Sequence, residues 1–196
     1  MKLLMARHGQ SEWQARGDDA GEDAPLTRLG ELQAHRLGAF LTKGESVTTI
    51  VASPLRRAHR TAMIVASHLK LPVHVEPDLR EFDEWSAGWA PLPASMWETS
   101  PATPDLAPGY DRFRRRVGAA LRHIVEGNAG ASQILLVAHG GTIGAILRIL
   151  LGSDTPRLWA SNASLHLVEW GQADREGWVF HYLNNLEHLP PFMKTS

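Results

Sequence analysis

Residues 3–9 read LLMARHG and residues 134–141 read ILLVAHGG, and the two segments share one design. Each is a short apolar run that leads directly into a histidine followed by glycine. Short, nearly all-apolar runs bounded by glycine are typical of strands buried on both faces, as in a parallel sheet covered by helices. The sequence therefore predicts two buried strands, one ending at His8 and the other at His139.

Helical and extended patterns alternate along the rest of the chain. Apolar runs predict further strands at 48–52 and 73–75, and a closing β-hairpin at 165–170 and 178–183. Helices are predicted at 28–41 after Thr27 as N-cap, at 54–69 after Ser53 as N-cap, at 111–125 and at 142–151. This alternation predicts a three-layer α/β/α fold in which helices flank a largely parallel sheet.

We expect residues 1–196 to form a single domain, with one excursion at about 85–109. That stretch holds five of the 12 prolines and three of the 7 tryptophans, so it cannot form long regular structure. Two interpretations remain open, a packed surface loop and a lid over a substrate pocket.

The composition excludes several classes of function. Lys and Arg number 20 against 21 Asp and Glu, so no overall charge drives the chain toward nucleic acid or an anionic membrane. Cysteine is absent, which excludes disulfides and thiolate chemistry. No apolar run is long enough to cross a membrane and no secretory signal is recognisable, so we expect a cytoplasmic protein.

The oligomeric state stays open. Arg112 and residues 114–116 predict a basic helix face that is solvated or paired with acids, with steering of an anionic substrate as the alternative.

Charged and imidazole side chains follow the ends of three predicted strands. Ligands of open α/β sheets bind beyond the carboxyl ends of the strands, where His8 and His139 both fall. Gly140 opens a helix, whose free N–H groups favour an anion. Arg7 and Arg57 add guanidinium groups, which bind phosphate through paired hydrogen bonds. The pattern predicts a phosphate pocket. The histidines lack metal-ligand spacing, so we expect no metal and no cofactor.

Five blocks occur in an order that resembles the histidine phosphatase superfamily, which includes the cofactor-dependent phosphoglycerate mutases. They are LMARHG at 4–9, DAPLTRLG at 23–30, SPLRRA at 53–58, LRE at 79–81 and VAHGGT at 137–142. Segments 162–164 and 183–189 also resemble its closing hairpin. The resemblance spans nearly the whole chain and implies the phosphoglycerate mutase-like fold.

The resemblance also implies roles for individual residues. His8 corresponds to the nucleophile that forms a phosphohistidine, and Arg7, Arg57 and His139 correspond to the phosphate clamp. Glu81 corresponds to the proton donor. The expected activity is that of a histidine acid phosphatase-type enzyme, a metal-independent phosphoric monoester hydrolase whose partner is a small phosphorylated metabolite.

Departures from the family pattern leave alternatives open. The segment after Glu81 is shortened and altered, so Asp83 or Glu84 could share or take the role of proton donor. Gln10 and Gln14 replace the common residues near the first motif and leave the substrate undetermined. Phosphoglycerate mutase-type phosphotransfer is one alternative, although the basic, tyrosine-containing insertion of those mutases is not recognisable between residues 81 and 111. A non-catalytic module that binds a phosphorylated ligand is the other.

Overall fold

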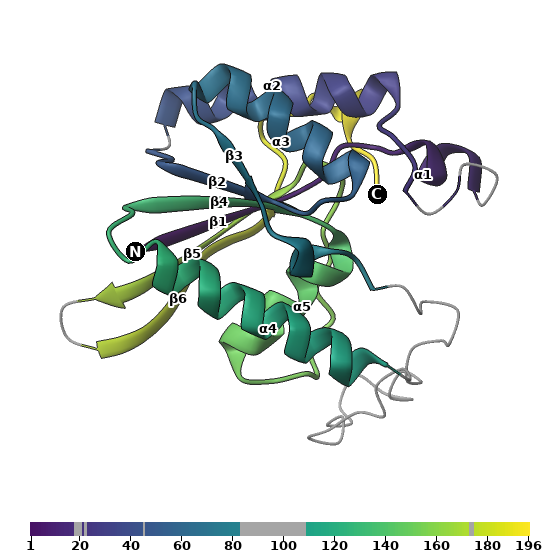
Figure 1. Cartoon of the computed structure of the whole chain (residues 1–196). Coiled ribbons are helices and arrows are strands. Elements are labelled where there is room, and N and C mark those ends of the chain that lie inside the picture. Colours follow the sequence, from purple (N-terminus) through teal and green to yellow (C-terminus); the bar gives the residue numbers. More distant parts are fainter. Residues whose placement is uncertain (18–20, 22, 45, 83–108, 173–174) are drawn as a thin grey trace.

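One mixed sheet of six strands, in the order β3-β2-β4-β1-β5-β6, organises the chain (Figure 1). The computed structural model describes residues 1–17, 21, 23–44, 46–82, 109–172 and 175–196. The strands are β1 (Lys2–Arg7), β2 (Thr49–Ala52), β3 (Val73–Val75), β4 (Gln133–Ala138), β5 (Leu165–Gln172) and β6 (Arg175–Asn185). The helices are α1 (Glu12–Arg16), α2 (Arg28–Gly44), α3 (Arg56–Leu69), α4 (Tyr110–Gly127) and α5 (Gly140–Leu151), with short 3-10 turns η2 (Pro77–Leu79) and η4 (Pro191–Met193).

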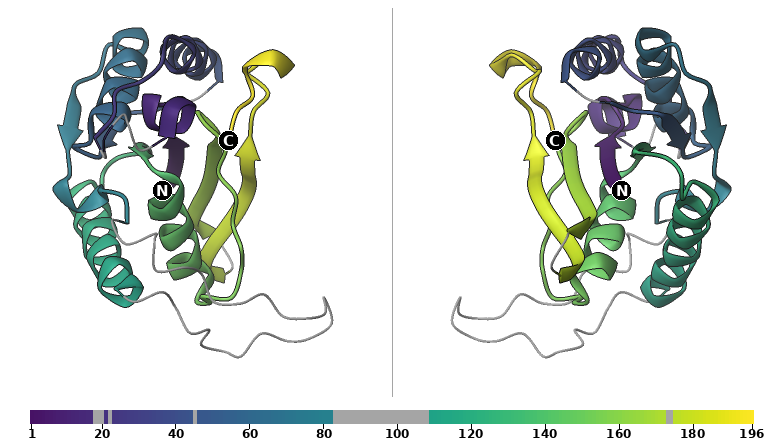
Figure 2. Two further views of the ribbon diagram at one scale, coloured as in Figure 1. Left: turned by 90° about the vertical axis from the view of Figure 1, so that its right-hand side faces the viewer. Right: turned by 90° about the vertical axis from the view of Figure 1, so that its left-hand side faces the viewer.

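The four strands from β3 to β1 are mutually parallel. In the β5–β6 hairpin, β5 pairs antiparallel with β1, and β6 pairs antiparallel with β5. Figure 2 shows this hairpin on the side of the molecule opposite β3. The predicted α/β class, the largely parallel sheet and the closing hairpin are therefore confirmed.

Strand β1 is buried on both faces, as its apolar run predicts. Leu3 and Met5 pack in one core cluster with residues of α4 and α5. Leu4 and Ala6 pack in a second cluster with residues of α2 and α3. Successive side chains of a strand point to opposite faces, so an unbroken apolar run supplies both cores. Figure 1 shows the corresponding layers, with α2 and α3 above the sheet and α4 and α5 below it.

Most predicted helix and strand boundaries lie within a few residues of the observed ones. Two local differences, the cap of α3 and the presence of α1, bear on function. The Thr27 hydroxyl accepts the N–H of Gly30 at 3.0 Å, as expected at the start of α2. Helix α3 begins at Arg56 behind Leu55 without a side-chain cap, so the prediction of Ser53 as its N-cap is wrong. Helix α1 was not predicted. It begins with a capping box between Ser11 and Gln14.

The predicted excursion at 85–109 falls outside the described residues except for Gly109. Gly109 caps the start of α4 with φ +83°, a left-handed conformation that glycine adopts without steric cost. Among the residues that the structure describes, no helix is long and apolar enough to cross a membrane.

Candidate active site

The carboxyl ends of β1, β4 and β2 bring the predicted site residues together. Arg7 and Ala138 are partners in the β1–β4 ladder, so the residues that follow them, His8 and His139, leave the sheet side by side. Their ring centroids lie 5.2 Å apart, and both side chains are buried. Arg57 reaches the same place from the first turn of α3, which follows β2.

The hydrogen bonds of His8 decide which ring nitrogen is available for attack. Nδ1 lies 2.7 Å from the carbonyl oxygen of Gly9. A carbonyl only accepts, so Nδ1 carries the proton and Nε2 of the neutral ring keeps its lone pair. Arg57 Nε donates to Nε2 at 3.3 Å. Burial, followed by the charges of Arg7 and Arg57, lowers the pKa of His8 well below its ordinary value. His8 is thus a neutral imidazole with an available lone pair at neutral pH.

The ring of His139 has one satisfied and one unsatisfied nitrogen. Nε2 lies 2.7 Å from the hydroxyl oxygen of Ser53, which explains the position of Ser53 better than a capping role does. Nδ1 is buried and has no hydrogen-bond partner within the described part of the chain. Burial lowers the pKa of His139 well below its ordinary value, and the charges of Arg57 and Arg7 act in the same direction. Buried polar atoms are normally paired, so this nitrogen is suited to meet a ligand oxygen.

Arg7, like His139, has a buried nitrogen that can bind a ligand oxygen. Its Nη1 donates to the carbonyl oxygen of Ala160 at 2.6 Å, while its buried Nε lacks a partner among the described residues. Burial, opposed by the carboxylate of Glu81, lowers the pKa of Arg7 to about 10, so the guanidinium stays charged at neutral pH. Gly140 lies beside it, since a Cβ on Gly140 would be 3.6 Å from Arg7 Nε. A cation with a spare donor at this position can neutralise a bound phosphate.

Glu81 is held by two backbone N–H groups. Its Oε1 accepts from Phe82 at 2.9 Å, and its Oε2 accepts from Gly141 at 3.0 Å. Burial raises the pKa of Glu81, although these hydrogen bonds and the charges of Arg7 and Arg57 oppose the shift. A buried carboxyl group with a raised pKa can hold a proton to donate. Asp83 and Glu84, the alternative donors, lie outside the described residues.

The contact between Glu81 and Gly141 also changes the expected role of the start of α5. The sequence predicted free N–H groups at this terminus that favour an anion. In the structure the Gly141 N–H donates to the Glu81 carboxylate, so a side chain of the protein occupies this donor. The helix terminus therefore positions Glu81 near Arg7 and Arg57, two of the predicted phosphate-binding residues.

Two supporting residues were not singled out by the sequence as part of the site. Asn162 donates through Nδ2 to the carbonyl oxygen of His8 at 3.3 Å, and its side chain pairs with that of Gln14 at 3.0 and 3.2 Å. Thr61 accepts the N–H of Gly9 at 3.1 Å and donates to the carbonyl oxygen of Arg57 at 2.8 Å. Asn162 lies in a quoted family-like block, but only the fold reveals its contact. Both residues hold the backbone on which the nucleophile candidate stands.

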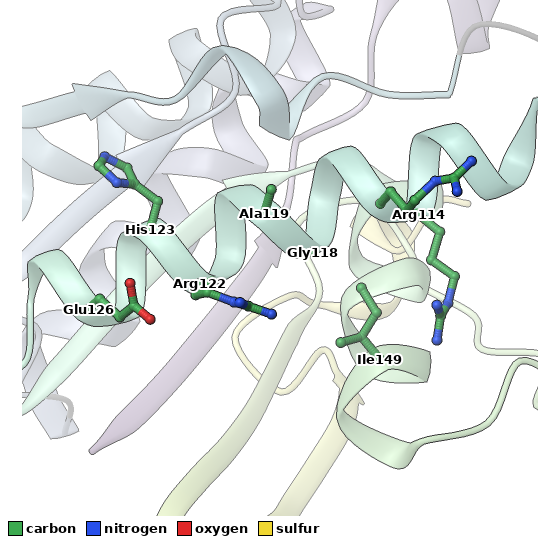
Figure 3. A pocket seen from close by; sticks show the side chains of 8 residues that line it. Arg114, Gly118, Ala119, Arg122, His123, Glu126 and Ile149 are labelled. Atoms are coloured by element: carbon green, nitrogen blue, oxygen red, sulfur yellow. The ribbon is translucent and has the colours of Figure 1, made fainter.

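Two residues of the basic face of α4, Arg114 and Arg115, lie apart from these residues, whereas Arg116 contacts the backbone of Glu81. A groove of about 520 Å³ runs along this face, and Figure 3 shows that its lining side chains come from α4 and, through Ile149, from α5. Arg114 pairs with Asp154 and Arg115 with Asp111, each at 2.8 Å. These two arginines are thus paired with acids, the first of the two predicted interpretations.

Comparisons with known proteins identify the family to which the chain belongs. A family model described as the histidine phosphatase superfamily (branch 1) matches residues 3–186. The chain is 32% identical to the Probable phosphoglycerate mutase GpmB of Yersinia enterocolitica, covering 96% of this chain and 95% of the relative. It is also 32% identical to the Uncharacterized phosphatase PhoE of Bacillus subtilis, covering 98% of each chain.

Solved structures share the fold. An alpha-ribazole phosphatase from Shigella flexneri aligns with a TM-score of 0.72 and 23% identity over 94% of this chain and 96% of the other. A mycobacterial glucosyl-3-phosphoglycerate phosphatase aligns with a TM-score of 0.69 and 24% identity over 93% and 98%. The family match over nearly the whole chain, together with relatives above 30% identity, establishes that this chain belongs to the histidine phosphatase superfamily.

Proposed function

We propose that the protein hydrolyses phosphomonoesters of small metabolites through a phosphohistidine formed on His8. The observation that carries the proposal is the state of His8, a buried neutral imidazole whose unprotonated Nε2 faces Arg57. Residues 1–196 act as one catalytic domain in this proposal, because strands from residue 2 to residue 185 share one sheet.

In the first step His8 Nε2 attacks phosphorus and the P–N bond forms as the P–O bond to the leaving group breaks. Glu81 gives its proton to the departing oxygen, which leaves as an alcohol. The Gly9 carbonyl accepts a hydrogen bond from Nδ1–H throughout, which favours the positive charge that develops on the ring. Arg7, Arg57 and His139 bind the non-bridging oxygens, where fixed positive and donor groups supply most of the stabilisation of the transition state.

In the second step a water molecule attacks the phosphorus of the phosphohistidine. The Glu81 carboxylate takes a proton from that water, the P–N bond breaks, and its electron pair returns to Nε2. Inorganic phosphate leaves, and His8 and Glu81 are restored to their starting protonation states. The raised pKa of Glu81 suits both steps, because one carboxyl group must lose and regain a proton in every turnover.

The test is phosphate release from 4-nitrophenyl phosphate and a metabolite panel, with EDTA present. The panel includes phosphoserine, α-ribazole phosphate, glucosyl-3-phosphoglycerate and 3-phosphoglycerate, because proteins of this fold are named for or bound to them. We expect turnover by the wild type and none by His8→Ala. His123→Ala, an exposed histidine on the outer face of α4, is the matched control and should retain activity.

Three outcomes would contradict the proposal. Turnover undiminished in His8→Ala would remove His8 as the nucleophile. Interconversion of 2- and 3-phosphoglycerate, primed by a bisphosphate and without net phosphate release, would identify a mutase instead. Phosphate-analogue binding without a phosphoenzyme on any compound would identify a binding module.

A further inference from the structure

Arg116 projects from α4 onto the backbone segment that carries Glu81. Its Nη1 donates to the carbonyl oxygen of Asp78 at 2.9 Å. Its Nη2 donates to the carbonyl oxygens of Arg80 at 3.1 Å and Glu81 at 3.2 Å. One guanidinium group thus binds three carbonyls of a four-residue segment. The planar fork of arginine makes this possible, because it directs several N–H donors from one rigid group.

The guanidinium is itself held in place on its own helix. Its central carbon lies 5.1 Å from the ring centroid of Phe113, one turn earlier on α4, in a cation–π contact. Phe113 is buried in the core and also packs on Phe82 with ring centroids 5.2 Å apart. The position of Arg116 is therefore set by packing, unlike that of a solvated surface cation.

Segment 78–81 has a second support, from helix α5. The hydroxyl of Thr142 on α5 donates to the carbonyl oxygens of Arg80 at 3.2 Å and Leu79 at 3.4 Å. Gly141, the preceding residue, donates its N–H to the Glu81 carboxylate. Helix α5 thus holds both the backbone and the side chain of this segment, and Arg116 fastens the same backbone to α4.

We propose that Arg116 is a positioning residue of the phosphatase reaction, which holds segment 78–81 so that the Glu81 carboxyl group meets the leaving oxygen. The inference rests on the proposed function, because it assigns Arg116 an effect only through proton transfer by Glu81. Segment 78–81 contains no regular hydrogen-bonded ladder beyond the η2 turn, so these side-chain donors replace the support that a helix or strand would give. Small displacements of a catalytic group lower the rate strongly.

The leaving group distinguishes this role from a general structural one. An alkyl phosphate needs a proton on its departing alkoxide, whereas 4-nitrophenyl phosphate releases a stable phenolate that needs little help. We therefore compare single-turnover rates of phosphoenzyme formation from glycerol 2-phosphate and 4-nitrophenyl phosphate. In Arg116→Ala we expect a loss of about tenfold or more with the alkyl ester and less than about threefold with the nitrophenyl ester.

Two variants serve as controls in this experiment. Arg115→Ala removes the neighbouring arginine, which is exposed and pairs with Asp111, and should leave both rates unchanged. Glu81→Gln removes the proton donor and should show the same selective loss in a larger degree. If Glu81→Gln does not lower the alkyl-ester rate relative to the nitrophenyl-ester rate, the proposed role of Glu81 fails, and the role of Arg116, which depends on it, fails with it.

The inference about Arg116 has its own contradicting results. Equal losses with both esters in a folded Arg116→Ala protein, or no loss with either, would overturn it while Glu81→Gln behaves as expected. If Arg116→Ala does not fold, Arg116→Lys and Thr142→Val carry the test, because each removes only part of the support. Both variants should have a lower ratio of alkyl-ester rate to nitrophenyl-ester rate than the wild type. An unchanged ratio in both would overturn the inference.

Discussion

Gly9 and Gly30 meet backbone to backbone at the start of α2. A Cβ atom on Gly9 would overlap the carbonyl oxygen of Gly30, and a Cβ on Gly30 would overlap that of Gln10. The turn is tied further by the Gln10 N–H, which donates to Gln33 Oε1 at 2.8 Å. The glycine after His8 therefore admits the start of a helix, which fixes the backbone beside the nucleophile candidate.

Gly30→Ala should therefore destabilise the protein, although alanine is the better helix former by about 1 kcal/mol. The added methyl group meets backbone that cannot rotate away, and we expect a net loss of about 1–3 kcal/mol in the free energy of unfolding. Urea denaturation measures the loss. Gly44→Ala at the end of the same helix, where a Cβ meets nothing within 4 Å, should be neutral or stabilising. Equal stability of the two variants would contradict the close approach.

Arg57 should be essential while its neighbour Arg56 is dispensable. Arg57 donates to His8 Nε2, whereas the side chain of Arg56 is exposed. Loss of a charged donor from the transition state costs about 10²–10³ in rate. We expect this loss in kcat/KM for Arg57→Ala and less than about twofold for Arg56→Ala. Comparable effects of the two substitutions, measured as phosphate release, would argue against a clamp at Arg57.

Proton donation by Glu81 should appear in the pH dependence of leaving-group selectivity. The donor is active only while protonated, so the rate with an alkyl ester falls as the pH rises above the raised pKa of Glu81. The nitrophenyl ester carries the same phosphate group but needs little protonation of its leaving oxygen. The ratio of the two kcat/KM values should therefore decrease with rising pH in the wild type. In Glu81→Gln the ratio should be low and independent of pH. A ratio that does not change with pH in the wild type would exclude this donor.

The stability of the fold should decrease in acid because of His166. This buried side chain on β5 is paired on both ring nitrogens, with the Ser164 hydroxyl and the Asn184 N–H, each at 3.2 Å. Burial lowers the pKa of His166 from 6.5 to about 4. Between these two values the unfolded chain binds a proton that the folded chain does not, so the free energy of unfolding falls as the pH falls. The full effect is about 3 kcal/mol.

Urea denaturation at pH 7, 5 and 4 measures this dependence in the wild type and in His166→Gln. The variant should lose part of the slope between pH 6.5 and 4, because it has no group to titrate there. His74→Ala, an exposed residue on β3, is the control and should keep the wild-type slope. Identical slopes in His166→Gln and the wild type would show that this histidine is not the titrating group.

The sequence alone located most of the helices and strands and the candidate site residues. Apolar runs that end in His-Gly predicted β1 and β4. Because ligands bind beyond the carboxyl ends of such strands, the same pattern predicted that His8 and His139 lie at the ligand-binding edge of the sheet. These predictions succeed because burial on both faces of a parallel strand leaves a continuous apolar run, which is a local signal. The ordered blocks with Arg7, Arg57 and Glu81 extended the same inference to the whole candidate site.

Tertiary structure alone decided what each supporting group contacts. Serine often caps helices, but Ser53 forms a hydrogen bond with His139. Arg116 belongs by sequence to a basic helix face, but it binds carbonyl groups of segment 78–81. Gly141 gives its N–H to Glu81, 60 residues away along the chain. Hydrogen bonds and close approaches depend on distance and direction between segments remote in sequence, and residue type restricts which bonds can form without selecting the partner. The candidate reacting groups could therefore be predicted from the sequence, whereas their orientation and protonation depend on how the fold buries and pairs them.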